Sequence, residues 1–279
     1  MTVKNLSDIS FETMLDCFLK AFENYFVELP SDKEYYKQRW KSAKVNFRYS
    51  YGMFEGEKMV GFILHALDKR KNKLIAFNTG TGVIPGYRGK RIVNSIYTYA
   101  LKDLKDKNIE MSVLEVITKN DIAIKLYESI GFEKCKEYKC FSGKIQLNTT
   151  EEVVLNEIAI NLVDWTRLPN QDLYSWDNQK ESILEGNYRF FQVIRTNEPE
   201  SFFVINPEIN YLAQFDLLKE ENNGWARLFA GIMKISELVK INNVDYRLKE
   251  KLEALNSVGL KNSVDQFEME LKIKDGNNV

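Results

Sequence analysis

Hydrophobic positions in the first half of the chain alternate between helical and strand-like spacing. Residues 10–24 repeat apolar side chains three and four positions apart and predict an amphipathic helix, and residues 32–43 predict a second one. Two apolar runs around the turn at Glu55–Lys58 predict a β-hairpin, and residues 73–84 predict the next strand. This stretch is therefore expected to place helices beside a sheet.

The same alternation continues after that strand. A helix is expected to begin near Gly89 or Lys90 and to stop near Asn108. Residues 109–117 predict a strand, and residues 120–130 predict a helix that a further strand follows. Strands and helices that alternate in this way indicate an α/β protein.

The second half repeats this order of elements more weakly. Residues 189–206 again predict a hairpin, and residues 209–218 again predict a strand with a helix after it. Ser257–Leu260 echoes Ser129–Phe132, because in both segments a glycine suited to ending a helix precedes an apolar strand. We infer from the recurring order that the fold is duplicated.

The predicted fold class is α/β (α+β), with a twisted mixed sheet flanked by helices and present twice. Residues 1–142 are expected to form the first domain. Residues 143–153 are polar and lack sustained periodicity, so they predict a linker to a second domain at residues 154–279.

The composition is that of an ordinary folded protein, with 279 residues, 44% of them hydrophobic and 28% charged. No run approaches the ~18 apolar residues of a membrane span, and the first ten residues lack the apolar core of a signal peptide. We therefore expect a cytoplasmic protein that does not enter a membrane. Three cysteines without CxxC spacing and a single histidine also argue against a metal site.

Charge is unevenly distributed between the halves. Residues 1–150 hold 25 Lys and Arg against 18 Asp and Glu, a net charge of +7, whereas residues 151–279 hold 14 against 22, a net charge of −8. Either these are solvated faces of two attracting halves, or the basic half binds an anion. The basic residues form no stripe interleaved with aromatics, so nucleic-acid binding is not expected.

The predicted helix near residue 90 begins with cations where anions or capping side chains are favoured. Arg88, Lys90 and Arg91 gather there, although a helix N-terminus carries a partial positive charge. Either the side chains extend into water, or a bound phosphate lies against the helix. The segment is no P-loop, since no Gly-Lys-Ser/Thr ends it, and Pro85 occupies the third glycine position of a dinucleotide motif.

Two motifs in this region resemble the GNAT superfamily of N-acetyltransferases. "VIPGYRGKRIV" resembles its phosphate loop, [Q/R]-x-x-G-x-[G/A], which follows a strand ending in Val-x-Pro. "NDIAIKLYESIGF" resembles its later motif, N-x-x-A-x-x-L-Y-x-x-x-G-F, and is separated from the loop by the expected helix and strand. The resemblance covers residues 3–142, and the second half resembles a degenerate copy without the loop, as in tandem GNAT proteins. Arg91 and Val93 depart from the pattern, because the family has small residues there.

The resemblance implies an acetyl-CoA-dependent enzyme that moves an acetyl group to an amine by direct attack on the thioester. Phosphates would lie at the backbone amides of the loop, and Asn120 would either bind pantetheine or only cap a helix. Val93 would crowd the pyrophosphate, or Arg91 would compensate by binding a phosphate. The implied cofactor-binding residues are Val83, Ile84, Arg88, Gly89, Lys90, Arg91, Ile92, Val93 and Asn120.

Two side chains are candidates for the chemistry. By resemblance, Tyr127 protonates the leaving thiolate, although its position on a helix stripe also fits core packing. Glu115 is the candidate base, because it shares an apolar strand face, where a carboxylate is costly unless it is paired or lies in a cleft. A salt bridge or an exposed strand face remains the alternative for Glu115. His65 is a second candidate base or a ligand of the acceptor, and a histidine satisfied in the core or at a strand edge is the favoured alternative.

The acceptor is expected to be a small-molecule amine, which the acidic second half would attract if it is cationic. A protein N-terminus or lysine is the next candidate. Tyr25 and Phe26 follow the first helix and are candidates for lining the acceptor site or for packing in the core. Two alternatives to an enzyme remain open: a non-catalytic acyl-CoA-binding regulatory protein, and an interaction scaffold.

Overall fold

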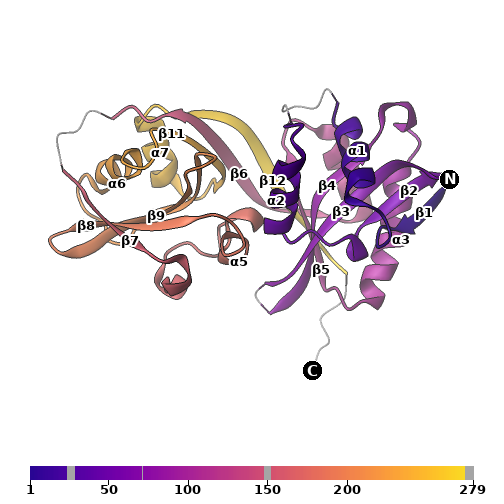
Figure 1. The fold of residues 1–279 in the computed structure, drawn as a ribbon, viewed down its shortest axis with the longest axis horizontal. Helices are drawn as coiled ribbons and strands as arrows, with labels where there is room; N and C mark the ends of the chain where they lie inside the picture. Colours follow the sequence, from indigo (N-terminus) through magenta and orange to yellow (C-terminus); the bar gives the residue numbers. More distant parts are fainter. Residues whose placement is uncertain (24–28, 71, 148–151, 274–279) are drawn as a thin grey trace. The chain divides into compact units, whose positions relative to one another are not determined.

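The computed structural model describes residues 1–23, 29–70, 72–147 and 152–273 (Figure 1). These residues form two compact units that interleave in the sequence. Unit 1 contains Met1–Val116, Asn120–Cys135 and Glu268–Val279, and unit 2 contains Ile117–Lys119 and Lys136–Phe267. The predicted domains are contiguous, and that contiguous division stays a prediction.

Unit 1 is a mixed sheet with the strand order β1-β2-β3-β4-β5-β12-β6, in which β4 and β5 pair in parallel. Parts of two long strands, β6 and β12, belong to it. Its elements are β1 (Thr2–Asn5), α1 (Phe11–Ala21), α2 (Lys33–Ser42), β2 (Tyr51–Glu55), β3 (Lys58–Arg70), β4 (Lys73–Val83), α3 (Ile92–Asp106), β5 (Met111–Ile117), α4 (Asp121–Ile130), β6 (Glu133–Lys144) and β12 (Lys261–Lys272).

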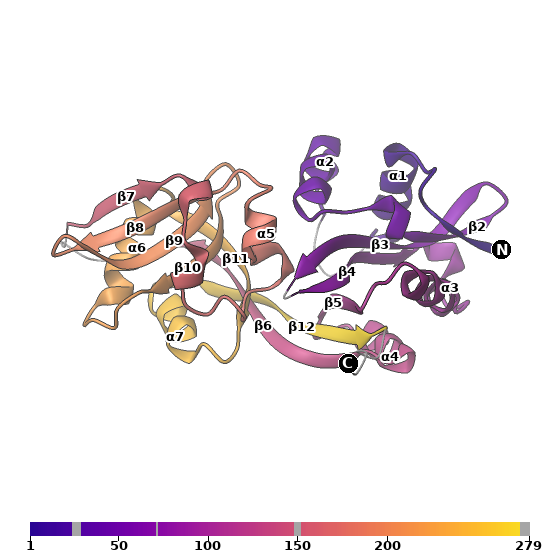
Figure 2. The same cartoon turned by 90° about the horizontal axis from the view of Figure 1, so that it is seen from below.

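Glycines in β3 and β4 bring helices close to both faces of this sheet. A Cβ atom on Gly80 would lie 3.0 Å from the Phe18 ring of α1, and one on Gly61 would lie 2.8 Å from Ile92 of α3. Figure 2 shows α1 and α2 on one face and α3 and α4 on the other. The end of β4 therefore lies between α1 and the start of α3.

Unit 2 has the strand order β12-β6-β11-β10-β9-β8-β7. Its apolar side chains form two clusters: Phe191 and Phe203 pack with α6 and α7, and Phe190 and Phe202 belong to the other cluster. Its further elements are β7 (Val154–Ile158), α5 (Lys180–Ile183), β8 (Arg189–Arg195), β9 (Glu198–Asn206), β10 (Tyr211–Leu217), α6 (Gly224–Met233), β11 (Leu238–Asp245) and α7 (Lys249–Ser257).

The predicted duplication is confirmed in the order of the elements. The series β2-β3-β4-α3-β5-α4-β6 recurs as β8-β9-β10-α6-β11-α7-β12. In each series the third and fourth strands pair in parallel. Gly131 and Gly259 end the equivalent helices with positive φ angles of 109° and 79°, the conformation for which glycine is favoured.

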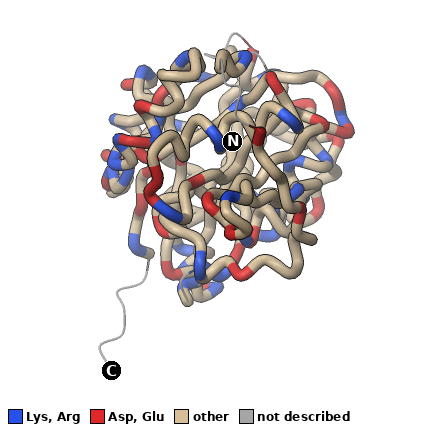
Figure 3. The backbone as a smooth tube through the Cα atoms, turned by 90° about the vertical axis from the view of Figure 1, so that its left-hand side faces the viewer, with Lys and Arg blue, Asp and Glu red and all other residues tan. Residues whose placement is uncertain are grey.

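Charged residues of both signs are interspersed along the backbone (Figure 3). None of the helices in the described ranges is long and apolar enough to cross a membrane.

Candidate functional site

The parallel strands β4 and β5 stop pairing in the middle of the sheet of unit 1. Their recorded pairs run from Ile75↔Met111 to Asn78↔Leu114, although β4 continues to Val83. Glu115 is the first β5 residue beyond the last pair, and it is half-buried with its Oε1 atom enclosed. The candidate base thus lies where the two strands separate.

The helix that follows β4 begins without a side-chain cap, as the sequence predicts. Its N-cap is Arg91, whose φ of 54° lies in the left-handed region, and Gly89 has a φ of 77°. Ser95 donates to the Arg91 carbonyl at 3.1 Å, so the N–H groups of Ile92 to Asn94 precede the first intrahelical bond. Such a first turn offers backbone donors and a positive dipole end to an anion.

The three cations near this turn have different surroundings. The Arg88 guanidinium donates to the carbonyls of Val83 at 3.2 Å and Ala21 at 3.0 Å, which ties the loop to the ends of β4 and α1. The Lys90 ammonium lies 4.7 Å from the centre of the Tyr87 ring. Arg91 is exposed. Arg88 and Lys90 are exposed as well, so all three side chains lie where a ligand at this turn could contact them.

The end of β4 is held by backbone contacts. The Ile84 N–H donates to the Val60 carbonyl at 3.1 Å, and the Val83 carbonyl accepts from Arg88. These two atoms are already engaged within the protein. The ligand contacts that the resemblance implies for Val83 and Ile84 stay predictions.

Tyr127 lies in an aromatic cluster between α3 and α4. Its side chain is 7% exposed, and its ring centre lies 6.2 Å from Tyr97 and 5.8 Å from Phe132, both edge-on. Burial raises the pKa of Tyr97 well above its usual value, which keeps that phenol neutral. The small exposed fraction fits a packing role for Tyr127, and its acid role stays a prediction.

Asn120 caps α4, as one of its two predicted roles requires. Its Oδ1 accepts from the Ala123 N–H at 3.2 Å, which satisfies a donor of the first helical turn. This bond uses the side-chain oxygen and leaves the pantetheine contact of Asn120 as a prediction. Tyr25 and Phe26, the predicted acceptor residues, lie outside the described residues.

His65 is buried in the core of unit 1. Its Nδ1 donates to the Tyr49 carbonyl at 2.7 Å, and burial lowers the pKa of its imidazole to about 4. The ring is therefore neutral at physiological pH. Within the described ranges, no group of three or more His, Cys, Asp or Glu side chains is arranged to hold a metal.

In unit 2 the loop equivalent to that of Arg91 is filled by the protein itself. Asn223 begins α6 with a φ of 62°, and one turn later the Arg227 guanidinium binds the Glu200 carboxylate at 2.9 and 2.5 Å. Arg227 also donates to the Asn222 carbonyl at 2.8 Å. The hydrogen bond from Arg227 lowers the pKa of Glu200 on β9, so a carboxylate of the protein itself balances the charge of this guanidinium.

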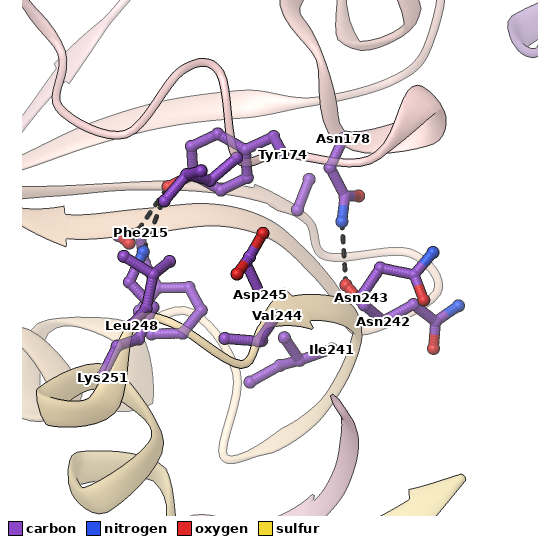
Figure 4. Close-up of a pocket in the computed structure, with 12 residues that line it drawn as sticks. Tyr174, Asn178, Phe215, Ile241, Asn242, Asn243, Val244, Asp245, Leu248 and Lys251 are labelled. Carbon is purple, nitrogen blue, oxygen red and sulfur yellow. Dashed lines mark hydrogen bonds between the residues drawn. The ribbon is translucent and has the colours of Figure 1, made fainter. Parts of the chain in front are cut away.

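The strands β10 and β11 of unit 2 also separate, and a side chain fills the space between them. Their recorded pairing is Tyr211↔Lys240. Asn178 donates to the Asn242 carbonyl at 2.9 Å (Figure 4). It also accepts from the Tyr211 hydroxyl at 2.8 Å, so it bridges the two strands. The remaining cavity has a volume of about 10 Å³, room for about one water molecule.

A buried ion pair closes the other side of this cavity. Lys251 of α7 donates to Asp216 of β10 at 2.8 Å, and the Tyr174 hydroxyl lies 3.3 Å from its ammonium. Burial lowers the pKa of Lys251. This pair could not be predicted from the sequence, because Lys251 lies among other charged residues in a stretch that resembles an exposed helix.

In unit 1, Asn78 is a residue near the candidate site that the sequence analysis did not identify. It is 6% exposed and lies at the last β4–β5 pair. An isolated asparagine within the apolar run "KLIAFNTG" was the available signal, because a buried amide requires specific partners.

Comparisons with known proteins agree with this arrangement. Residues 12–132 match the model of the acetyltransferase (GNAT) family. A search of curated proteins finds no match.

Solved structures of low sequence identity share the fold over nearly the whole chain. A tandem GNAT protein from the clavulanic acid biosynthesis pathway has 11% identity and a TM-score of 0.69, covering 99% of this chain and 100% of that chain. A GCN5-related N-acetyltransferase from Sphaerobacter thermophilus has 9% identity and a TM-score of 0.67, covering 96% and 94%. One from Anabaena variabilis has 13% identity and a TM-score of 0.62, covering 98% and 73%.

Proposed function

We propose that the chain transfers an acetyl group from acetyl-CoA to an amine, because residues 12–132 match the model of the acetyltransferase (GNAT) family. The observation that carries this proposal is the open first turn of α3, which begins at a positive-φ residue beside strands that have separated. The equivalent places in unit 2 are filled by Arg227 and Asn178. We therefore assign the cofactor to unit 1.

The phosphates of acetyl-CoA would lie against the amides from Arg88 to Val93, which include the first turn of α3. The Arg91 guanidinium would add a charge-assisted hydrogen bond, since it is exposed at the start of that turn. The basic charge of residues 1–150 supports the binding of a polyanion. Asn120 would reach the pantetheine arm with the amide nitrogen that its capping bond leaves available.

Acetyl-CoA supplies an activated acetyl thioester, and two side chains of the protein each transfer one proton. Glu115 accepts a proton from the attacking amine, directly or through water, as the new C–N bond forms. Tyr127 donates its hydroxyl proton to the sulfur as the C–S bond breaks, and it regains a proton from solvent. Backbone donors near Val83 stabilise the charge that develops on the thioester oxygen.

We propose a small-molecule amine as the acceptor, with a cationic amine favoured by the net charge of −8 on residues 151–279. A protein N-terminus or lysine is the second candidate. Free thiols at all three cysteines support a cytoplasmic location, since disulfides are rare there.

The direct test is release of free thiol from acetyl-CoA by the intact chain. The acceptors would be a panel of small amines and peptides with a free N-terminus or an internal lysine. We expect thiol release that depends on one class of amine. Binding of acetyl-CoA without thiol release from any acceptor would support a non-catalytic regulator instead, and absence of binding would contradict both.

A further inference from the structure

Strand β4 contains an irregularity just where it leaves β5. In the pairing of β4 with β3, Leu64 lies opposite Gly80 and the next residue, His65, lies opposite Asn78. One step along β3 therefore corresponds to two steps along β4. Thr79 is therefore an extra residue in β4, which makes this a β-bulge. A bulge bends its strand and interrupts the ladder, so backbone donors near it need other acceptors.

The side chain of Asn78 satisfies the groups around the bulge. Its Oδ1 accepts from the Gly80 N–H at 3.0 Å, and its Nδ2 donates to the Thr81 hydroxyl at 2.7 Å and to the Tyr97 hydroxyl at 2.7 Å. The donors and the acceptor of the amide group are thus all used in a buried setting. This arrangement holds the strand in its bent course from within.

Tyr97 contacts both Asn78 at the bulge and Tyr127 of the candidate site. It lies on α3, the helix whose first turn is the proposed phosphate site, and it is 1% exposed. Its ring contacts Tyr127 edge-on, with the centroids 6.2 Å apart. Asn78, together with Thr81, therefore holds the hydroxyl of a residue that packs between the phosphate helix and the proposed acid.

We propose that Asn78 is a positioning residue, which holds β4 bent away from β5 and orients Tyr97 so that Tyr127 faces the leaving sulfur. This inference rests on the proposed acetyl transfer. It deepens that proposal, because Asn78 acts on the geometry of the reaction without touching the reacting atoms. A displacement of about 1 Å in such a site can reduce the rate about 10²-fold.

Three variants of the intact chain separate hydrogen bonding from packing. Asn78→Leu keeps a similar volume and removes all three bonds. Asn78→Asp keeps an acceptor for the Gly80 N–H and offers its second oxygen to the hydroxyls of Thr81 and Tyr97. Tyr97→Phe removes one bond and keeps the ring, so it remains informative if Asn78→Leu fails to fold.

The experiment measures kcat and KM for acetyl-CoA by thiol release, and hydrogen exchange of the Gly80 amide. We expect Asn78→Leu to lower kcat about 10²-fold with little change in KM, and to accelerate exchange at Gly80. Tyr97→Phe should lower kcat about tenfold. Asn78→Asp should keep a kcat much closer to that of the wild type than Asn78→Leu does, because it still offers hydrogen-bond partners to the same groups.

Wild-type kcat and KM in folded Asn78→Leu and Tyr97→Phe would overturn the positioning role while leaving the proposed function intact. Unchanged exchange at Gly80 in Asn78→Leu would overturn the claim that this side chain holds the bulge. A wild-type chain that releases no thiol with any amine would overturn the proposed function, and the positioning role would fall with it.

Discussion

At the scale of single residues, His65 makes the stability of the protein depend on pH. Burial lowers its pKa from 6.5 to about 4, so the unfolded chain takes up a proton between these values and the folded chain does not. The free energy of unfolding should therefore fall as pH drops through this window, by about 3 kcal/mol in total. Above pH 6.5, titration of His65 should no longer change the free energy of unfolding.

The variant His65→Asn tests this, because its amide can still donate to the Tyr49 carbonyl but cannot titrate. Chemical denaturation of both proteins from pH 4 to 7.5 gives the comparison. The wild type should lose more stability than the variant below pH 6.5. Parallel curves would show that His65 does not stay neutral in the fold.

Tyr127 is a second residue whose role one substitution decides. Tyr127→Phe removes the hydroxyl and keeps the ring contacts with Tyr97 and Phe132. We expect kcat to fall by ~10²–10⁴-fold with little change in KM for acetyl-CoA, because loss of a general acid affects the chemical step. An unchanged kcat would assign Tyr127 to packing alone.

Residue roles were predictable from the sequence where the cause is local. The cap by Asn120 could be foreseen, because its partner lies three residues away. The hydrogen bond of Arg88 to the Ala21 carbonyl could not be foreseen, because the two residues lie 67 positions apart in the sequence. The same holds for Asn78, whose bond to Tyr97 depends on how a helix packs against a strand.

At the scale of elements, the start of α3 combines backbone strain with a ligand site. Arg91 has a φ of 54°, which costs an L-residue about 1–2 kcal/mol, and glycine avoids this cost. Arg91→Gly should raise the free energy of unfolding by about 1 kcal/mol, after allowing for the greater freedom of glycine in the unfolded chain. It should also weaken acetyl-CoA binding about tenfold, because a cation is removed from the phosphate site.

Arg91→Ala is the matched control, since it removes the charge and keeps a Cβ at the same φ. It should lose affinity to the same degree without the gain in stability. Thermal unfolding and calorimetry measure the two effects separately. Unchanged affinity in both variants would place Arg91 outside the phosphate site.

Most elements of the fold were predictable, because their signals are local. The hairpin at Glu55–Lys58 and the helix ending at Gly131 follow from turn and cap chemistry. The start of α3 was placed too early, at Gly89 or Lys90. It lies at Ile92, because Gly89 and Arg91 take positive φ angles that interrupt a helix.

At the scale of the whole molecule, unit 1 depends on the far end of the chain. Its sheet includes the last residues of β12, and directly after this strand the Ile273 N–H donates to the Glu110 carbonyl at 2.9 Å. Deleting residues 261–279 should therefore abolish cooperative folding of unit 1, because β12 lies between β5 and β6 in its strand order.

Thermal unfolding followed by circular dichroism makes this comparison. Equal melting curves for the intact chain and for residues 1–260 would contradict the dependence. The duplication itself was predictable, because each half repeats the local signals of its elements in one order. The interleaving was not, since contacts such as that of Cys135 with the Glu268 carbonyl join residues 133 positions apart.

The central claim is that the intact chain binds acetyl-CoA at one site, at the start of α3 in unit 1. Calorimetric titration with acetyl-CoA tests it most directly, because it gives both the stoichiometry and the affinity. We predict one molecule per chain, with binding strongly weakened by Arg91→Glu and unchanged by Asn223→Asp at the equivalent position of unit 2. Two molecules per chain, no binding, or a loss of affinity caused by Asn223→Asp would contradict the account.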